Sequence, residues 1–150
     1  MSAALHLARE ADADRLDALA SACRAEMEIA APDDTRRAAL LPLLEGSPHG
    51  AVYLIGPARA PVGYAVVTFG WSLEQGGMTG TIDELYMRPP VRGRGIATEV
   101  LLSLAPALAE AGLRALHLRA DAGNEAARRL CARTGFVARE GYMTLTRPLS

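Results

Sequence analysis

The residues best suited to chemistry lie in one stretch, residues 82–97, whose sequence is IDELYMRPPVRGRGIA and in which a strand ends, a turn follows and a helix begins. Gly93 and Gly95 allow backbone angles that other residues avoid, and they let a charged group approach the chain closely. Arg92 and Arg94 can add charge-assisted hydrogen bonds. The free N–H groups and the dipole of a following helix would point at the same place. The pattern therefore predicts a cradle for an anion such as a pyrophosphate.

Three other interpretations of this turn have to be compared with the anion cradle. The turn can be purely structural, with no ligand. A dinucleotide site of the Rossmann type would need a third glycine where Thr98 stands, and the rest of the chain is too short for a second nucleotide-binding half. A P-loop is excluded because all 16 basic residues are arginine and the chain has no lysine.

Two neighbouring acidic residues, Asp83 and Glu84, come just before the turn. In a regular strand adjacent side chains point to opposite faces, so only one of the two would face a substrate. A glutamate with its ordinary pKa of about 4.3 is a weak base toward an ammonium of pKa about 10. Such a carboxylate would act through a water chain or would orient a cationic substrate. The alternative role is an ion pair with Arg88 or another arginine.

The composition limits the kind of protein that positions these residues. The chain has 150 residues, a formal net charge of -1 and 50% hydrophobic residues. These values fit one folded domain over residues 1–150 and disfavour a nucleic-acid-binding protein. The two cysteines are far apart and the three histidines are isolated, so neither a disulfide nor a metal site is expected. No apolar run approaches the roughly 18 residues of a membrane span and no signal peptide is recognisable, so we expect a cytoplasmic protein.

Apolar spacing and turn residues predict a mixed α/β (α+β) domain. Strands are expected over residues 3–7, 51–55, 62–71, 79–88 and 113–120. Helices are expected over 12–30, from a cap at Asp33 or Asp34 through Leu44, from Ile96 through Leu108, and over 121–134. Pro106 should kink or shorten the third helix. A last hairpin or strand is expected over 137–147.

Two motifs resemble those of a known family. Arg92-x-x-Gly95-x-Ala97 resembles the (Q/R)-x-x-G-x-(G/A) pyrophosphate loop of the GCN5-related N-acetyltransferases (GNAT), which bind acetyl-CoA. The string Asn124-x-x-Ala127-x-x-Leu130, followed by Gly135-Phe136, resembles that family's second motif. The resemblance extends over the whole chain in element order. It implies the GNAT fold, a mixed and mostly antiparallel sheet flanked by helices, with fourth and fifth strands that splay apart.

The resemblance also implies the cofactor site, with acetyl-CoA as co-substrate and no metal. The pantetheine arm would lie between the splayed strands, beside Tyr86, and would pair with the backbone of Leu85 and Met87. Asn124 would contact the pantetheine or cap its own helix. The pyrophosphate would be held by the loop and the first helical turn, which comprise Arg92, Gly93, Arg94, Gly95, Ile96, Ala97 and Thr98.

The chemistry that the resemblance implies is attack of a primary amine on the thioester, with the Met87 N–H stabilising the oxyanion. Glu84 matches the family's acidic residue, and Asp83 is the second choice. The family's acid is a tyrosine in the second motif, where this chain has Cys131. The shorter thiol would need a bridging water to protonate the leaving thiolate. Tyr142 or Tyr86 could replace it, the thiolate could leave unaided, or Cys131 could be a small buried residue.

The acceptor is implied only as a class, a small-molecule amine or a protein N-terminus. An acidic cluster could favour a cation or could simply be a solvated helix face, and three aromatic residues could wall the pocket or belong to the core. These residues are Glu26, Glu28, Asp33 and Asp34, and Tyr64, Phe69 and Trp71. A homodimer is common in the family. The alternative function is an acetyl-CoA-binding sensor or partner module without transfer activity, which the missing tyrosine favours and the Asp83–Glu84 pair opposes.

Overall fold

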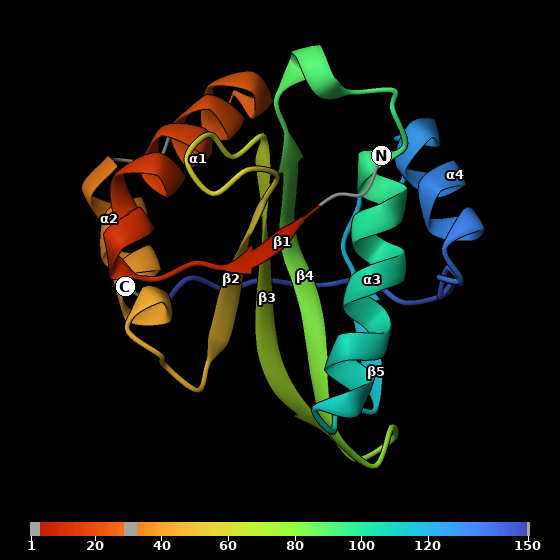
Figure 1. Ribbon diagram of the computed structural model, residues 1–150. Helices are drawn as coiled ribbons and strands as arrows, with labels where there is room; N and C mark the ends of the chain where they lie inside the picture. Colours follow the sequence, from red (N-terminus) through yellow and green to blue (C-terminus); the bar gives the residue numbers. More distant parts are fainter. Residues whose placement is uncertain (1–3, 29–32, 150) are drawn as a thin grey trace.

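The computed structural model describes residues 4–28 and 33–149. Its centre is a five-stranded sheet in the order β1-β2-β3-β4-β5 (Figure 1). The pairs from β1 to β4 are antiparallel, and β5 is parallel to β4. The strands are β1 (Leu5–Leu7), β2 (Gly50–Ile55), β3 (Gly63–Ser72), β4 (Gly77–Met87) and β5 (Ala115–Leu118).

Helices cover both faces of the sheet (Figure 1). Buried residues of α1 and α2 pack with Val52, Leu54 and Tyr64 on one face. Buried residues of α3 pack with Val67 and Ile82 on the other, and α4 lies against α3. Their bounds are α1 (Ala13–Met27), α2 (Asp33–Leu44), α3 (Ile96–Glu110) and α4 (Glu125–Arg133). The predicted mixed α/β fold is confirmed, and residues 3 and 29–30 of the expected elements lie outside the described residues.

Two features of β4 shape its end near α3. Val66 pairs with Glu84 and Val67 with Ile82, so Asp83 is the extra residue of a β-bulge. Pairing with β5 stops at Ile82. From Asp83 to Met87, β4 therefore has β3 on one side and none of the described strands on the other.

Helix α3 runs through Pro106 to Glu110, so of the two expected effects of this proline, a kink or a shorter helix, the shortening was wrong. Proline removes the N–H that would bond to the carbonyl of Leu102. Leu102 is 53% exposed, so this carbonyl lies on the face of the helix that water reaches. The apolar stripe predicted for this helix is confirmed by the buried side chains of Val100, Leu101, Leu104 and Leu108.

The expected last hairpin or strand was also wrong. Residues 137–149 contain no helix or strand, and each of them is exposed. The alternation of apolar and polar residues around Met143 and Leu145 suits a strand, but a strand is stable only when a neighbour accepts its hydrogen bonds.

Among the helices that the structure describes, none is long and apolar enough to cross a membrane.

Candidate active site

The N-terminus of α3 presents free backbone donors. Gly95 is the N-cap residue and has no side chain, so nothing caps the helix from within. The first bond into the helix runs from the N–H of Glu99 to the carbonyl of Gly95, at 3.1 Å. The N–H groups of Ile96, Ala97 and Thr98 are therefore without partners in the described chain, as expected for an uncapped first turn. Together with the helix dipole they form a site for an anion.

The glycines of the loop keep this site open. Gly93 and Gly95 have φ angles of +79° and +76°, a region that side chains other than glycine rarely adopt. A Cβ atom built on either residue would meet no atom within 4 Å. Both glycines therefore border open space, and a ligand can approach their backbone directly.

The two arginines of the loop differ in their surroundings. Within the described residues, Arg94 has no hydrogen bond or ion pair and is exposed. Arg92 donates from Nη1 and Nη2 to the two carboxylate oxygens of Glu26, at 2.7 and 2.6 Å, and from Nε to the carbonyl of Met87, at 3.0 Å. Arg94 is thus the cation of the loop that is free to meet an anion.

The end of β4 offers a free backbone edge next to this loop. Arg88 donates its N–H to the carbonyl of Val62, so Arg88 is hydrogen-bonded toward the β3 side. Bonded positions alternate along an antiparallel pair, so the backbone groups of Leu85 and Met87 point away from β3. They point to the side on which β5 no longer pairs with β4. An extended ligand can bind there as a strand would.

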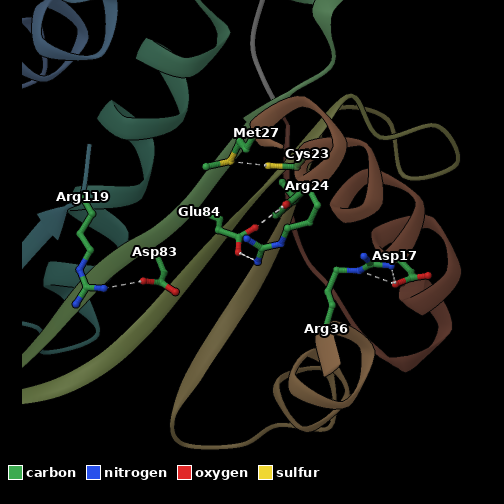
Figure 2. Close-up of polar contacts among 9 residues, drawn as sticks. Asp17, Cys23, Arg24, Met27, Arg36, Asp83, Glu84 and Arg119 are labelled. Carbon is green, nitrogen blue, oxygen red and sulfur yellow. Dashed lines mark hydrogen bonds and ion pairs between the residues drawn. The ribbon is translucent and has the colours of Figure 1, made fainter. Parts of the chain in front are cut away.

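Glu84 is tied to the first helix and to the core (Figure 2). Its Oε2 accepts a hydrogen bond and ion pair from Nη2 of Arg24 on α1, and its Oε1 accepts a 2.7 Å hydrogen bond from the Tyr64 hydroxyl. Tyr64 is fully buried. Burial, followed by the hydrogen bond to Glu84, raises the pKa of Tyr64 well above its ordinary value, so the hydroxyl stays protonated and donates.

Asp83 pairs with a different arginine, Arg119, which follows β5, at 3.5 Å (Figure 2). The assumption that neighbours alternate between faces fails here. Ile82 packs on the α3 face and Glu84 bonds to α1, although they are two residues apart. The bulge at Asp83 accounts for this change, because the extra residue shifts the alternation by one. Glu84 is therefore the carboxylate that faces α1.

The expected acidic cluster is partly neutralised. Glu26 is paired with Arg92, whereas Glu28 and Asp34 lie exposed at the ends of α1 and α2. The side chain of Asp33 lies outside the described residues. Of the expected aromatic wall, Tyr64 belongs to the core beside Glu84, Phe69 packs under α3, and Trp71 is 74% exposed near the far end of β3.

Comparison with known proteins identifies this arrangement. The family model described as "Acetyltransferase (GNAT) family" matches residues 16–136. The chain belongs to the GNAT family. No curated protein matches the sequence. The matched residues extend from α1 past Gly135, so both motifs lie within the GNAT match.

Solved structures share this GNAT architecture. An integron cassette protein, HFX_CASS3, from the mobile metagenome of Cole Harbour Salt Marsh is 30% identical, with a TM-score of 0.83 over 97% of this chain and 90% of the other. A ribosomal-protein-alanine N-acetyltransferase from Brucella melitensis biovar Abortus 2308 is 21% identical, with a TM-score of 0.77 over 97% and 99%. The aminoglycoside N-acetyltransferase AAC(6')-Iy, solved in complex with CoA, is 16% identical, with a TM-score of 0.79 over 99% and 95%. The last two likenesses concern the fold alone.

The residues that resemble the second GNAT motif lie on and after α4. Asn124 caps this helix, accepting a 3.0 Å hydrogen bond from the N–H of Ala127. Cys131 is partly buried, and burial raises the pKa of its thiol. Tyr142 is 72% exposed. Its ring stacks on Arg139, which pairs with Glu74 in the β3–β4 turn, at the opposite end of β4 from the glycine loop. The structure thus brings the loop, β4 and Glu84 together and leaves Tyr142 apart.

Sequence reasoning missed Arg24 and its contact with Glu84, which are 60 residues apart in the chain. It also missed the pairing of Arg92 with Glu26, across 66 residues. One signal was available for Arg24. It follows the buried Ala20 by four residues, and the helical period therefore places it at the border of the buried face of α1.

Proposed function

We propose that this GNAT chain is an acetyl-CoA-dependent N-acetyltransferase that transfers an acetyl group to a primary amine. One observation carries the proposal: an uncapped helix N-terminus with open glycines lies at the end of a strand whose free backbone edge continues toward it. The first element suits a pyrophosphate and the second suits an extended amide-containing arm. CoA contains both. The aminoglycoside N-acetyltransferase of the same fold, described in complex with CoA, supports this assignment.

Each part of the site then has a role in holding the co-substrate, which supplies an acetyl group activated as a thioester. The N–H groups of Ile96, Ala97 and Thr98 and the guanidinium of Arg94 hold the pyrophosphate. The backbone of Leu85 and Met87 aligns the arm along β4. The Met87 N–H points into the same space and is the donor for the developing oxyanion, in a position fixed by the strand.

Glu84 is proposed to orient the amine. Each of its carboxylate oxygens already accepts one hydrogen bond, from Arg24 or from Tyr64, and each keeps a second lone pair. Because both oxygens are already engaged by Arg24 and Tyr64, a role in positioning the acceptor suits Glu84 better than that of a free base. Asp83 is the second candidate for this role.

The experiment that tests this function is an assay of CoA thiol release from acetyl-CoA with a panel of amines, including aminoglycosides, amino acids and peptides with free N-termini. Acceptor-dependent release with at least one class is expected. Tight binding of acetyl-CoA with no release across the panel would instead support the sensor or partner module. No binding of acetyl-CoA at all would contradict both functions.

A further inference from the structure

Arg92 lies in the loop that is proposed to hold the pyrophosphate, but its guanidinium is directed toward Glu26 and the Met87 carbonyl. Both of its Nη atoms donate to the carboxylate of Glu26 on α1, a bidentate arrangement, and its Nε donates to the carbonyl of Met87. The guanidinium carbon also lies 5.6 Å from the centre of the Tyr86 ring. Three groups on α1 and β4, the Glu26 carboxylate, the Met87 carbonyl and the Tyr86 ring, therefore define the position of this side chain.

The contact between Arg92 and Glu26 is specific to these two residues. The side chain of Glu28, two residues further along, makes no hydrogen bond or ion pair within the described residues. Arg94, two residues after Arg92, has none either. The chain thus offers, for each sign of charge, one paired and one unpaired side chain two residues apart, which makes matched controls available.

The pairing of Arg92 with Glu26 opposes the binding of an anion at the loop. Three of the five N–H donors of Arg92 are engaged, and its charge is compensated by a carboxylate in bidentate contact. Hydrogen bonding to Arg92 holds the pKa of Glu26 below its ordinary range, so the pair remains ionised at neutral pH. The Met87 carbonyl that accepts from Nε belongs to the free edge of β4, so Arg92 also occupies a backbone group that an extended ligand would use.

We propose that Glu26 is a positioning residue of the acetyl-CoA site, which holds Arg92 against α1 and away from the phosphates. This inference rests on the proposed function. When CoA binds, Arg92 exchanges its bonds with Glu26 and Met87 for bonds with the phosphates. Glu26 thereby lowers the affinity for CoA and links occupation of that site to the end of α1.

The expected effect of the Arg92–Glu26 pair on CoA affinity is small because both side chains are partly exposed. The Arg92 and Glu26 side chains are 43% and 44% exposed, so their pairing is screened by water. Exposed ion pairs contribute little, and releasing one arginine corresponds to a change in binding of about two- to fivefold. Glu26→Gln should therefore tighten CoA binding by this factor.

The test is a double-mutant cycle on CoA dissociation constants measured by calorimetry. The variants are Glu26→Gln, Arg92→Gln and the pair together, with Glu28→Gln as the control for simple loss of a negative charge. We expect about two- to fivefold tighter binding for Glu26→Gln, little change for Glu28→Gln, and no effect of Glu26→Gln in the Arg92→Gln background. Glu26→Asp, which keeps the charge, should bind nearly as the parent chain does.

Acetyl-pantetheine lacks the pyrophosphate. Its binding therefore separates the effect of Arg92 on the phosphates from its effect on the Met87 carbonyl. Its affinity should change less than that of CoA on Glu26→Gln. The proposal would be overturned if Glu28→Gln tightened CoA binding as much as Glu26→Gln does, or if Glu26→Gln had its full effect in the Arg92→Gln background. Either result would show that Glu26 acts only through its negative charge and not through Arg92. Unchanged CoA affinity in Glu26→Gln would overturn it as well. If the parent chain itself did not bind CoA, the proposed function would fail, and this inference with it.

Discussion

Two adjacent carboxylates, Asp83 and Glu84, hold different positions because of a single extra residue in β4. Glu84 meets Arg24 and Tyr64, and the more exposed Asp83 meets Arg119. The sequence placed both near the site but could not rank them by geometry, because the bulge is set by the pairing of β4 with β3. Neither arginine partner is near in sequence, so both ion pairs depend on the completed fold.

Replacing each of these carboxylates by its amide should separate their roles. Glu84→Gln should raise the KM for the amine roughly tenfold with a smaller change in kcat, since it removes a charge that orients the acceptor. Asp83→Asn should change both constants less than twofold. Steady-state kinetics at saturating acetyl-CoA provide the measurement. A larger rise in the KM for the amine with Asp83→Asn than with Glu84→Gln would show that Asp83, and not Glu84, orients the acceptor.

Cys131 occupies the position where the family's pattern has a tyrosine, but its surroundings suit a packing residue. It is partly buried on α4, next to Leu130, which packs against the α3 cluster. Burial keeps the thiol protonated, and the side chain is short. We expect Cys131→Ala to retain most of kcat with an unchanged KM for acetyl-CoA. A large loss of kcat at unchanged acetyl-CoA affinity would make the thiol the proton donor.

At the level of elements, the glycine loop and α3 were predictable from sequence because their signals are local. Gly93, Gly95 and the apolar stripe of α3 lie within about 15 residues of one another, and the structure has them as expected. The Asn124 cap of α4 is local in the same way. The parallel pairing of β5 with β4, by contrast, joins segments separated by α3, and local spacing contains no information on where such pairing stops.

The C-terminal segment, residues 137–149, is the element on which sequence and structure differ most. Its pattern predicts a strand, whereas the structure leaves it exposed and without regular hydrogen bonds to the sheet. Amide hydrogen exchange should therefore be fast across this segment and slow in β3 and β4. Protection of residues 142–146 equal to that of β4 would show that the segment is paired in solution, contrary to the structure.

Considered as a whole, the molecule keeps several weak acids neutral in its interior. Burial raises the pKa values of Cys23, Tyr53 and Tyr64, and the bond to Glu84 adds to the effect on Tyr64. In each case the folded pKa exceeds the unfolded one, which is about 8.5 for a thiol and about 10 for a phenol. The unfolded chain then loses these protons first, so stability is complete at neutral pH and falls as the pH rises beyond these values.

Urea denaturation between pH 7 and pH 10.5 measures this dependence. The midpoint should decline above about pH 8.5 and more steeply near pH 10. Tyr64→Phe should be less stable at pH 7, because Glu84 loses a hydrogen bond, but its decline near pH 10 should be shallower. Tyr142→Phe, at an exposed site, is the matched control and should follow the parent chain. A steeper decline for Tyr64→Phe would contradict the assigned sign.

The open N-terminus of α3 is proposed to bind the pyrophosphate of acetyl-CoA, and a substitution at Gly95 is the sharpest test of this proposal. Gly95→Leu would fill the open space above the N–H groups, while Gly112→Leu imposes similar backbone strain, at φ of +102°, just beyond the other end of the same helix. Calorimetry with CoA, accompanied by thermal denaturation, is the measurement. We expect a loss of CoA affinity on the order of tenfold or more for Gly95→Leu alone, with similar losses of stability in both variants. Unchanged CoA affinity in a folded Gly95→Leu variant would contradict it.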